Sequence, residues 1–284
     1  MNFDMTRTWN NCVSLVQSNF QLLALLAGVF ILIPNLIFYI AAPDVMAAAS
    51  TMGTDEDQLI ALLQENAGTL IGVGLFVMVA QFIGYASLVA LMGNKRPTVG
   101  EAMRQALSAV PSLLGVTVLM VLAYIVVALG IALVIGIVGG LLSLLLGPAA
   151  AVLVGFISVA LAFLAVIYVL ARFIMVYPAV MLEGVSNPVA AIRRSLELTR
   201  LQGKRIFLFI ILLMVAYMVI SIVVSLVFGL LMSSMGTGPG AAFESGMVNG
   251  VLGSLVAMIY AGIMVAMYRQ LAGSDTPDIG ETFD

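Results

Sequence analysis

Six segments of the chain are apolar over a length that crosses a lipid bilayer. About 20 apolar helical residues span a hydrocarbon core of about 30 Å, and a backbone in lipid must satisfy its own hydrogen bonds as a helix or a closed barrel. We therefore predict an all-α integral membrane protein with six transmembrane helices. The predicted spans cover about residues 20–41, 67–92, 111–138, 149–171, 206–232 and 247–268.

The composition also indicates lipid as the main solvent of the folded chain. Of the 284 residues, 63% are hydrophobic and only 9% are charged, whereas about a quarter of the residues of a soluble domain are charged. We expect one membrane domain over residues 1–284, with no soluble domain. The polar lead before residue 20 is too long for a secretory signal peptide, so we expect the first apolar segment to stay in the protein.

The longest uncharged stretch has to hold two of the six spans. It lies between Arg104 and Arg172, and at a rise of about 1.5 Å per residue it is long enough for two crossings. Gly139-Gly140 and Gly147-Pro148 are typical of a turn. We therefore predict that these positions mark the bend between spans three and four.

All the cations fall on one side of this layout. The eleven lysines and arginines lie before span one, between spans two and three, between spans four and five, and after span six. The loops on the opposite side contain acids, among them Asp44, Glu65 and Glu244, and no cation. Because short loops rich in Lys and Arg stay in the cytoplasm, we predict a multi-pass protein of the bacterial inner membrane with both termini in the cytoplasm.

Each odd-numbered span is preceded by a polar, amphipathic segment. Before span three, Thr98-x-x-Glu101 forms a capping box, and before span five Asn187-Pro188 is a favourable helix start. Helices of this kind lie in the interface plane, so we interpret the chain as three parallel repeats of an interfacial elbow helix plus a transmembrane hairpin. The alternative is that any protein built from hairpins has amphipathic connectors. The repeats would cover about residues 1–94, 95–185 and 186–272, with a short acidic tail at 273–284.

Small residues spaced four apart occur in several spans. Gly68 and Gly72 form such a pair in span two, and Gly246 and Gly250 form another near the start of span six. This spacing lets helix backbones approach closely. We therefore expect tight helix packing at both pairs.

The segment that follows span four carries a family resemblance. It runs from Arg172 to Gly184 as RFIMVYPAVMLEG and continues through Asn187-Pro188 to the run RRSLELTR at 193–200. This stretch resembles the membrane domain fused to some bacterial glycerophosphodiester phosphodiesterases, and it is similar to the YciC-like bacterial inner-membrane proteins of unassigned function. The resemblance implies a membrane-domain fold in a lipid-envelope setting. Because we expect no separate soluble catalytic domain in this chain, we expect the resemblance to transfer no phosphodiesterase activity.

The residue types that many enzymes and metal sites use are missing. The chain has no His and a single Cys, Cys12, which excludes histidine bases, Cys-rich metal sites and disulfides within the chain. We interpret Cys12 as an inert interfacial thiol, with acylation as the alternative. The net charge of -3, with no clustered basic excess, argues against nucleic acid as a partner. We expect no cofactor and no metal, and we predict that the protein is not an enzyme.

Two sets of polar residues are candidates for a functional role. Asn35 and Gln81 lie inside spans, where an amide either joins helices or binds a ligand. Charged residues at the predicted cytoplasmic interface are candidates for binding lipid headgroups, and the alternative is that they only set the topology. These headgroup candidates are Arg172, Glu183, Arg193, Arg194, Arg200, Lys204 and Arg205.

These features favour a non-enzymatic membrane protein that binds or transports lipid-like or hydrophobic molecules in envelope homeostasis. No Asp, Glu, Lys, Arg or His lies near the middle of a predicted span, as an ion or proton route would require. The expected partner is membrane phospholipid. The alternative is a structural or assembly module that binds partner proteins in the membrane or associates with copies of itself.

Overall fold

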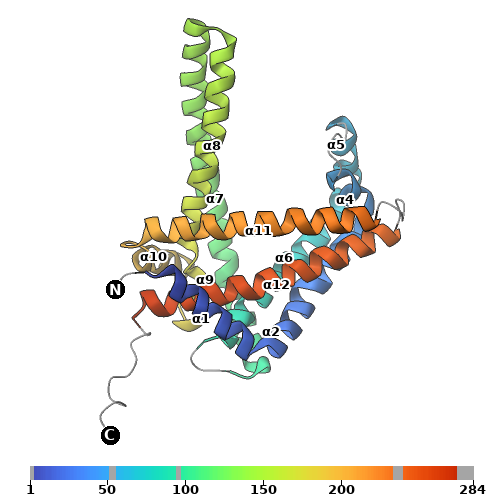
Figure 1. Cartoon of the computed structure of the whole chain (residues 1–284), viewed down its shortest axis with the longest axis vertical. Helices are drawn as coiled ribbons and strands as arrows, with labels where there is room; N and C mark the ends of the chain where they lie inside the picture. The colour runs from blue at the N-terminus through green and yellow to red at the C-terminus, as the bar shows by residue number, and fades with distance from the viewer. Residues whose placement is uncertain (1–2, 51–55, 94–96, 233–238, 274–284) are drawn as a thin grey trace.

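The computed structural model describes residues 3–50, 56–93, 97–232 and 239–273. Within these ranges the chain forms helices joined by short connections, with no strand (Figure 1). The helices are α1 (Met5–Ser18), α2 (Phe20–Ala27), the π-helical turn η1 (Gly28–Leu32), α3 (Ile33–Ala41), α4 (Pro43–Ser50), α5 (Glu56–Glu65), α6 (Ala67–Leu91), α7 (Val99–Leu146), α8 (Pro148–Phe173), α9 (Val176–Leu182), α10 (Pro188–Leu198), α11 (Gly203–Met232) and α12 (Pro239–Leu271).

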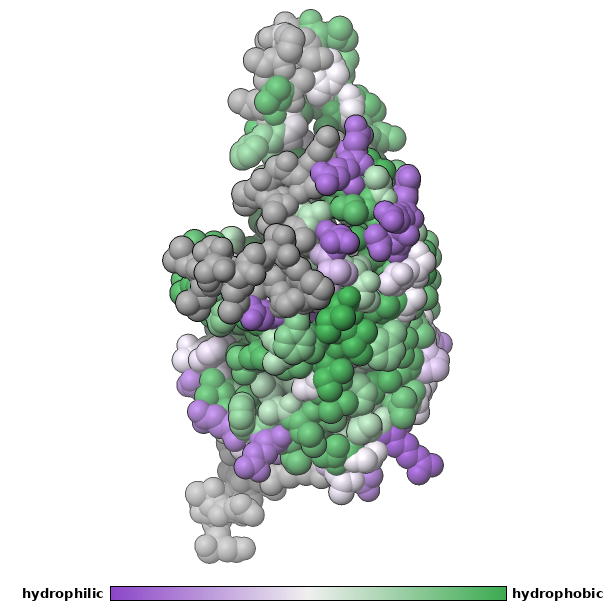
Figure 2. All heavy atoms as spheres, turned by 90° about the vertical axis from the view of Figure 1, so that its right-hand side faces the viewer, coloured by the Kyte–Doolittle hydropathy of each residue, from purple (hydrophilic) through white to green (hydrophobic). Residues whose placement is uncertain are grey.

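Six helical stretches are long and apolar enough to cross a membrane, so the predicted number of spans is confirmed for the described residues. The face shown in Figure 2 carries a broad hydrophobic area with hydrophilic residues at its margins. An apolar surface of this extent needs lipid or another apolar covering. The six stretches are Phe20–Ala41, Ala67–Leu91, Val99–Leu141, Val154–Leu182, Gly203–Phe228 and Phe243–Leu271.

The best-buried span is α12, in whose most apolar window 61% of the residues are buried. It lies against α1, α2, η1, α3 and α6. A Cβ atom on Gly246 or Gly250 would come within 2.9 or 3.2 Å of side chains in α3 and η1, respectively. The predicted tight packing at this pair is therefore confirmed. At Gly68 and Gly72 the prediction was wrong, because a Cβ atom there would meet no described atom within 4 Å.

The turn end of the α7–α8 hairpin extends away from the other helices, and α11 runs across the base of the hairpin (Figure 1). None of the residues in the most apolar window of α7 is buried, and only 11% are buried in those of the Val154–Leu182 and Gly203–Phe228 stretches. The predicted bend is correct at Gly147-Pro148, where Gly147 has a φ of 85° that favours glycine. At Gly139-Gly140 the prediction was wrong, since α7 continues to Leu146. Two glycines inside an apolar helix do not end it when no capping group or proline follows at once.

The predicted elbow helices differ from one another. α1 and α10 are separate short helices whose C-caps are Asn19 and Thr199. The predicted capping box forms, with hydrogen bonds in both directions between Thr98 and Glu101, but α7 then continues through Pro111 into the span. A separate elbow before span three was therefore wrong, because nothing ends the helix there and Pro111 removes only one backbone hydrogen bond. The structure does not show three equal elbow–hairpin repeats.

Candidate functional site

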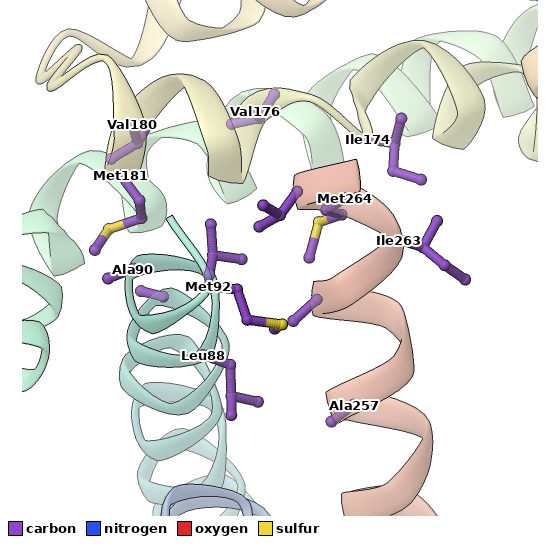
Figure 3. Close-up of a cluster of buried hydrophobic side chains, with 14 of the residues drawn as sticks. Leu88, Ala90, Met92, Ile174, Val176, Val180, Met181, Ala257, Ile263 and Met264 are labelled. Atoms are coloured by element: carbon purple, nitrogen blue, oxygen red, sulfur yellow. The ribbon is translucent and has the colours of Figure 1, made fainter. Parts of the chain in front are cut away.

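The ends of several helices meet around a cavity of about 390 Å³, which we call the junction cavity. α6 and α12 contribute their C-terminal ends, α7 its N-terminal part, and α9 and α10 complete the wall. Packed apolar side chains of α6, α9 and α12 lie beside it, among them Met92, Met181 and Met264 (Figure 3). The lining residues are Ala90, Gly93, Pro97, Gln105, Met181, Leu182, Arg194, Tyr268, Arg269 and Ala272.

The turn between α9 and α10 brings two charged residues of the resemblance segment together. Gly184 follows α9 with a φ of 74°, a conformation that glycine adopts without strain. Asn187 then starts α10, and its side-chain oxygen accepts hydrogen bonds from the backbone N–H groups of Val189 and Ala190. As a result α10 folds back beside α9, with Glu183 close to Arg194.

Arg194 and Glu183 form a bidentate ion pair at the edge of the cavity. Arg194 Nε lies 2.8 Å from Glu183 Oε2, and Arg194 Nη2 lies 2.9 Å from Oε1. The hydroxyl of Tyr268 on α12 donates a further hydrogen bond to Oε1, at 3.0 Å. The hydrogen bond that Arg194 donates to Glu183 raises the pKa of Arg194 above its ordinary value. One carboxylate thus joins α9, α10 and α12 through charge-assisted hydrogen bonds.

A second guanidinium reaches the cavity from the last turn of α12. Arg269 Nη2 donates to the backbone carbonyl of Met92, at 2.8 Å, where α6 ends. A cation at a helix C-terminus is stabilised by the helix dipole and by the unpaired carbonyls of the last turn. On the opposite wall, Gln105 Nε2 donates to the carbonyl of Met181 at 2.6 Å and joins α7 to α9.

The junction cavity has the chemistry of an anion site. The guanidinium groups of Arg194 and Arg269 line it, and Arg194 is also paired with the carboxylate of Glu183. Gln105 and Tyr268 add neutral polar groups to the wall. Arginine binds phosphate and carboxylate groups with two parallel hydrogen bonds, so a small anionic group fits this arrangement. Among the described residues, no cluster of His, Cys, Asp and Glu has the makings of a metal site.

Arg172 lies at the α8–α10 contact and does not line the junction cavity. Its Nη2 donates to the carbonyl of Leu196, at 3.0 Å, and its own carbonyl accepts from the hydroxyl of Ser195, at 2.7 Å. Glu183 pairs with Arg194 on α10 and not with Arg172. Arg172 therefore holds α10 against the base of α8.

The other headgroup candidates lie on exposed surfaces. Arg193 forms an ion pair with Glu197 one turn along α10, at 3.1 Å, and the side chain of Arg193 is 82% exposed. Arg200, Lys204 and Arg205 are exposed around the α10–α11 connection. An exposed pair of this kind contributes little to stability. The structure thus separates the seven candidates into a cavity pair, an interhelical anchor and an exposed basic group.

Asn35 and Gln81, the two candidate amides inside predicted spans, are each partly buried. Asn35 is half-buried, and its Nδ2 donates to the carbonyl of Ile31, at 2.8 Å, in its own helical segment. Gln81 is half-buried on α6. The recorded Asn35 bond satisfies an amide within one span and does not join two helices.

Cys12 is buried between α1 and α12. Its Sγ donates to the carbonyl of Ile259, at 3.3 Å, and a Cβ on Gly262 would lie only 2.9 Å from the sulfur. Burial raises the pKa of the thiol to about 12. A thiol that stays protonated and inaccessible is a poor nucleophile, which favours the inert interpretation of Cys12 over acylation.

Sequence reasoning missed three residues of the cavity wall: Gln105, Tyr268 and Arg269. Arg269 is visible in the sequence as the last cation after span six, but it counts there only toward the topology. Its proximity to Arg194 depends on α12 ending beside α6 and α10, and no local pattern encodes that contact. A Tyr-Arg pair closing an apolar span is the one available signal, since both side chains favour the membrane interface.

The comparisons with known proteins bear on the second half of the chain. Residues 149–281 match the family described as the membrane domain of glycerophosphoryl diester phosphodiesterase. The predicted resemblance is therefore confirmed over these residues. The matched stretch contains Glu183, Arg194 and Arg269, whereas the walls from α6 and α7 lie outside it. No curated protein and no solved structure matches the chain.

Proposed function

We propose that this protein is a non-enzymatic membrane protein whose junction cavity binds the anionic headgroup of a membrane phospholipid. The observation that carries the proposal is the pair Arg194 and Arg269, whose side chains line one cavity from different helices. A phosphate diester carries one negative charge and several acceptor oxygens, so it matches two arginine forks.

The surroundings of the cavity support a lipid rather than a soluble anion. The cavity lies where the ends of apolar, membrane-length helices meet, which is where the headgroups of a bilayer would lie. The exposed cations Arg200, Lys204 and Arg205 are close by in the chain. Each cation near an anionic bilayer surface contributes about 1 kcal/mol of attraction, so this group would raise the local concentration of anionic lipid.

The proposed setting follows from the distribution of charge. We place the cation-rich end of the molecule in the cytoplasm of a bacterium and the protein in the inner membrane, with both termini inside. Two elbow–hairpin units in one orientation form part of this proposal, with α1 and α10 as the elbows. In such a layout the cavity would take lipid from the cytoplasmic leaflet, either to hold it or to move it.

A second candidate function is a membrane module that binds partner proteins or copies of itself. The observation that favours it is the low burial of the α7–α8 hairpin and α11, whose most apolar windows are between 0 and 11% buried. Another protein would cover this surface as well as lipid does. Purification in mild detergent separates the two functions, because a stoichiometric protein partner supports the second and a selectively retained phospholipid the first.

The first function is tested by competition between two lipids. The full chain is purified in mild detergent, incubated with equal amounts of phosphatidylglycerol and phosphatidylcholine of the same acyl chains, and examined by native mass spectrometry. We expect phosphatidylglycerol to be preferred, and Arg269→Gln to lower that preference about fivefold, the effect of about 1 kcal/mol.

Two variants separate charge from structure. Arg269→Lys keeps the cation and should retain most of the preference, although it loses the fork geometry. Arg193→Gln removes a cation that is 82% exposed on the outer face of α10 and should leave the preference nearly unchanged. Absence of any preference in the natural chain, or an equal loss with Arg193→Gln, would overturn the headgroup function.

A further inference from the structure

A groove of about 600 Å³ lies along the α7–α8 hairpin, apart from the junction cavity. Its walls come from Tyr124 to Ile135 on α7 and from Ala162 to Leu170 on α8. Every lining residue except Tyr124 is aliphatic. The groove is therefore an apolar surface with one hydroxyl group.

Small side chains make the groove. The turn at Gly147 sets the pairing of the two antiparallel helices, because residues equally far from the turn lie opposite one another. Ala128 then lies level with Val166, and Ala132 with Ala162, so alanines occupy the middle of the α7 wall and one end of the α8 wall. The contact between Gly139 and Val154, where a Cβ atom would lie 3.6 Å from Val154 Cγ1, agrees with this pairing.

The groove begins close to the charged end of the hairpin. By the same pairing, Arg172 at the end of α8 lies level with residue 122, only two residues from Tyr124. From Tyr124 to Ile135 the groove runs for about 16 Å along the helix at about 1.5 Å per residue. One leaflet is about half of a 30 Å hydrocarbon core. The length and position of the groove thus match one acyl chain of the adjacent leaflet.

Tyrosine side chains gather at the end of the groove nearest Arg172. A smaller cavity of about 100 Å³ shares Leu170 with the groove and is lined by Tyr177 and Tyr260. The ring of Tyr85 lies 6.2 Å from each of these two rings, between their centroids. The hydroxyl of Tyr124 is buried and has no hydrogen-bond partner in the part of the chain that the structure describes. A buried hydroxyl without an acceptor is costly, so this group calls for a ligand that supplies one.

The ligand group that would accept a hydrogen bond from Tyr124 is an uncharged one. Among the described residues, those that line the groove and the smaller cavity include no Lys, Arg, Asp or Glu. A carboxylate or phosphate placed there would be desolvated without a counter-charge, whereas an ester carbonyl needs only a hydroxyl donor. The hydroxyl of Thr117 is already used, since it donates to the carbonyl of Leu113 at 2.9 Å.

We propose that the α7–α8 groove binds one acyl chain of a membrane phospholipid, with Tyr124 as the hydrogen-bond donor to its ester carbonyl. The chain lies between Ala128 and Ala132 on one wall and Ala162 and Val166 on the other. The ester group meets the tyrosine end, and the headgroup extends toward the level of Arg172. This site is separate from the junction cavity and does not depend on it.

The occupant is identified by photochemical labelling of the full chain in nanodiscs. The probe is phosphatidylethanolamine with a diazirine midway along one acyl chain, and the labelled positions are mapped by peptide mass spectrometry. We expect labelling to concentrate on residues 124–135 and 162–170. The double variant Ala128→Leu with Ala132→Leu fills the groove and should lower labelling there at least tenfold. Ala160→Leu adds the same side chain to α8 outside the groove lining and should leave labelling unchanged.

Two results would overturn the proposal. Equal labelling of groove residues and of outward-facing residues on the same helices would mean that the hairpin has only an ordinary lipid shell. Stronger labelling of the groove by a diazirine-bearing free fatty acid than by the phospholipid would assign the groove to a different ligand. Because neither readout uses Arg194 or Arg269, failure here leaves the headgroup function of the junction cavity intact.

Tyr124→Phe tests the hydroxyl, because the two explanations of this buried group predict opposite changes. If the hydroxyl binds an ester carbonyl, its loss should lower phospholipid labelling about fivefold, as expected for one neutral hydrogen bond, and should lower the unfolding temperature in lipid. If the hydroxyl has no ligand, the variant should be labelled like the natural chain and should unfold at a higher temperature. The second pattern would refute the role of Tyr124.

Discussion

Replacing Glu183 by Gln should weaken the fold and strengthen lipid binding at the same time. The carboxylate holds Arg194 through contacts of 2.8 and 2.9 Å and accepts from Tyr268 at 3.0 Å. The amide keeps one acceptor oxygen, which can still accept from Arg194 Nη2 and Tyr268, but it loses the charge and the acceptor for Arg194 Nε. Hydrogen bonds to charged groups contribute about 1.5–3 kcal/mol when buried. Because the Arg194 side chain is 39% exposed, screening reduces the loss of unfolding free energy to about 1 kcal/mol.

The effect on lipid has the opposite sign. With Glu183 neutral, the guanidinium of Arg194 is no longer compensated, and the cavity gains one net positive charge. One additional cation near a headgroup is worth about 1 kcal/mol, so the affinity for phosphatidylglycerol should rise about fivefold. The assay combines unfolding in detergent, followed by circular dichroism, with titration of phosphatidylglycerol by native mass spectrometry.

The matched control for this prediction is Glu197→Gln. Glu197 pairs with Arg193 on the exposed face of α10, where the two side chains are 51% and 82% exposed. An exposed pair contributes little, so neither stability nor lipid affinity should change measurably. A fall in lipid affinity that parallels the fall in stability of Glu183→Gln would refute the reasoning. It would mean that Glu183 positions Arg194 for the lipid and does not compete with it.

Three further outcomes test the packing, the buried thiol and the topology. Gly262→Ala should lower the unfolding free energy by about 1–3 kcal/mol, because the new methyl group would lie 2.9 Å from the sulfur of Cys12. Gly68→Ala, with open space around it, should change the unfolding free energy by less than about 0.5 kcal/mol. Similar losses for both variants would refute the packing at Gly262. Cys12 should resist maleimide at pH 7–8 in the folded protein and react after unfolding in SDS, since burial raises its pKa to about 12 and leaves almost no thiolate below that pH; rapid labelling of the folded protein would contradict this. Reporters inserted after Gly147 and after Gln202 should lie on opposite sides of the membrane, outside and inside respectively, and two reporters on one side would break the six-span topology.

Local patterns were enough for the class of the fold and for several of its details. Six apolar segments predict six spans because lipid leaves the backbone few other solutions. The capping box at Thr98 and Glu101, the N-cap at Asn187 and the turn at Gly147 are each decided by residues within a few positions of one another. The close approach at Gly250 also follows from residue type, since only a residue without a Cβ fits against η1.

Local patterns misplaced features that depend on continuity along a helix. The segment after Thr98 is amphipathic, and its pattern suggested a helix that ends before the span. In the structure α7 continues through Pro111, because the loss of one hydrogen bond does not outweigh the many on either side of it. Gly139-Gly140 was misjudged for the same reason, since a glycine pair weakens a helix without ending it.

The sequence by itself determined that this is a membrane protein of six apolar helices whose cations lie in a few connecting segments, because those properties follow from composition and spacing. Only the tertiary structure decided which cations act together. Arg194 and Arg269 are 75 residues apart in the numbering and share one cavity, while Arg193, the neighbour of Arg194, faces away from it. The sequence alone likewise did not predict the α7–α8 groove. A gap between two helices depends on which small residues lie opposite one another, and the turn at Gly147 decides that pairing.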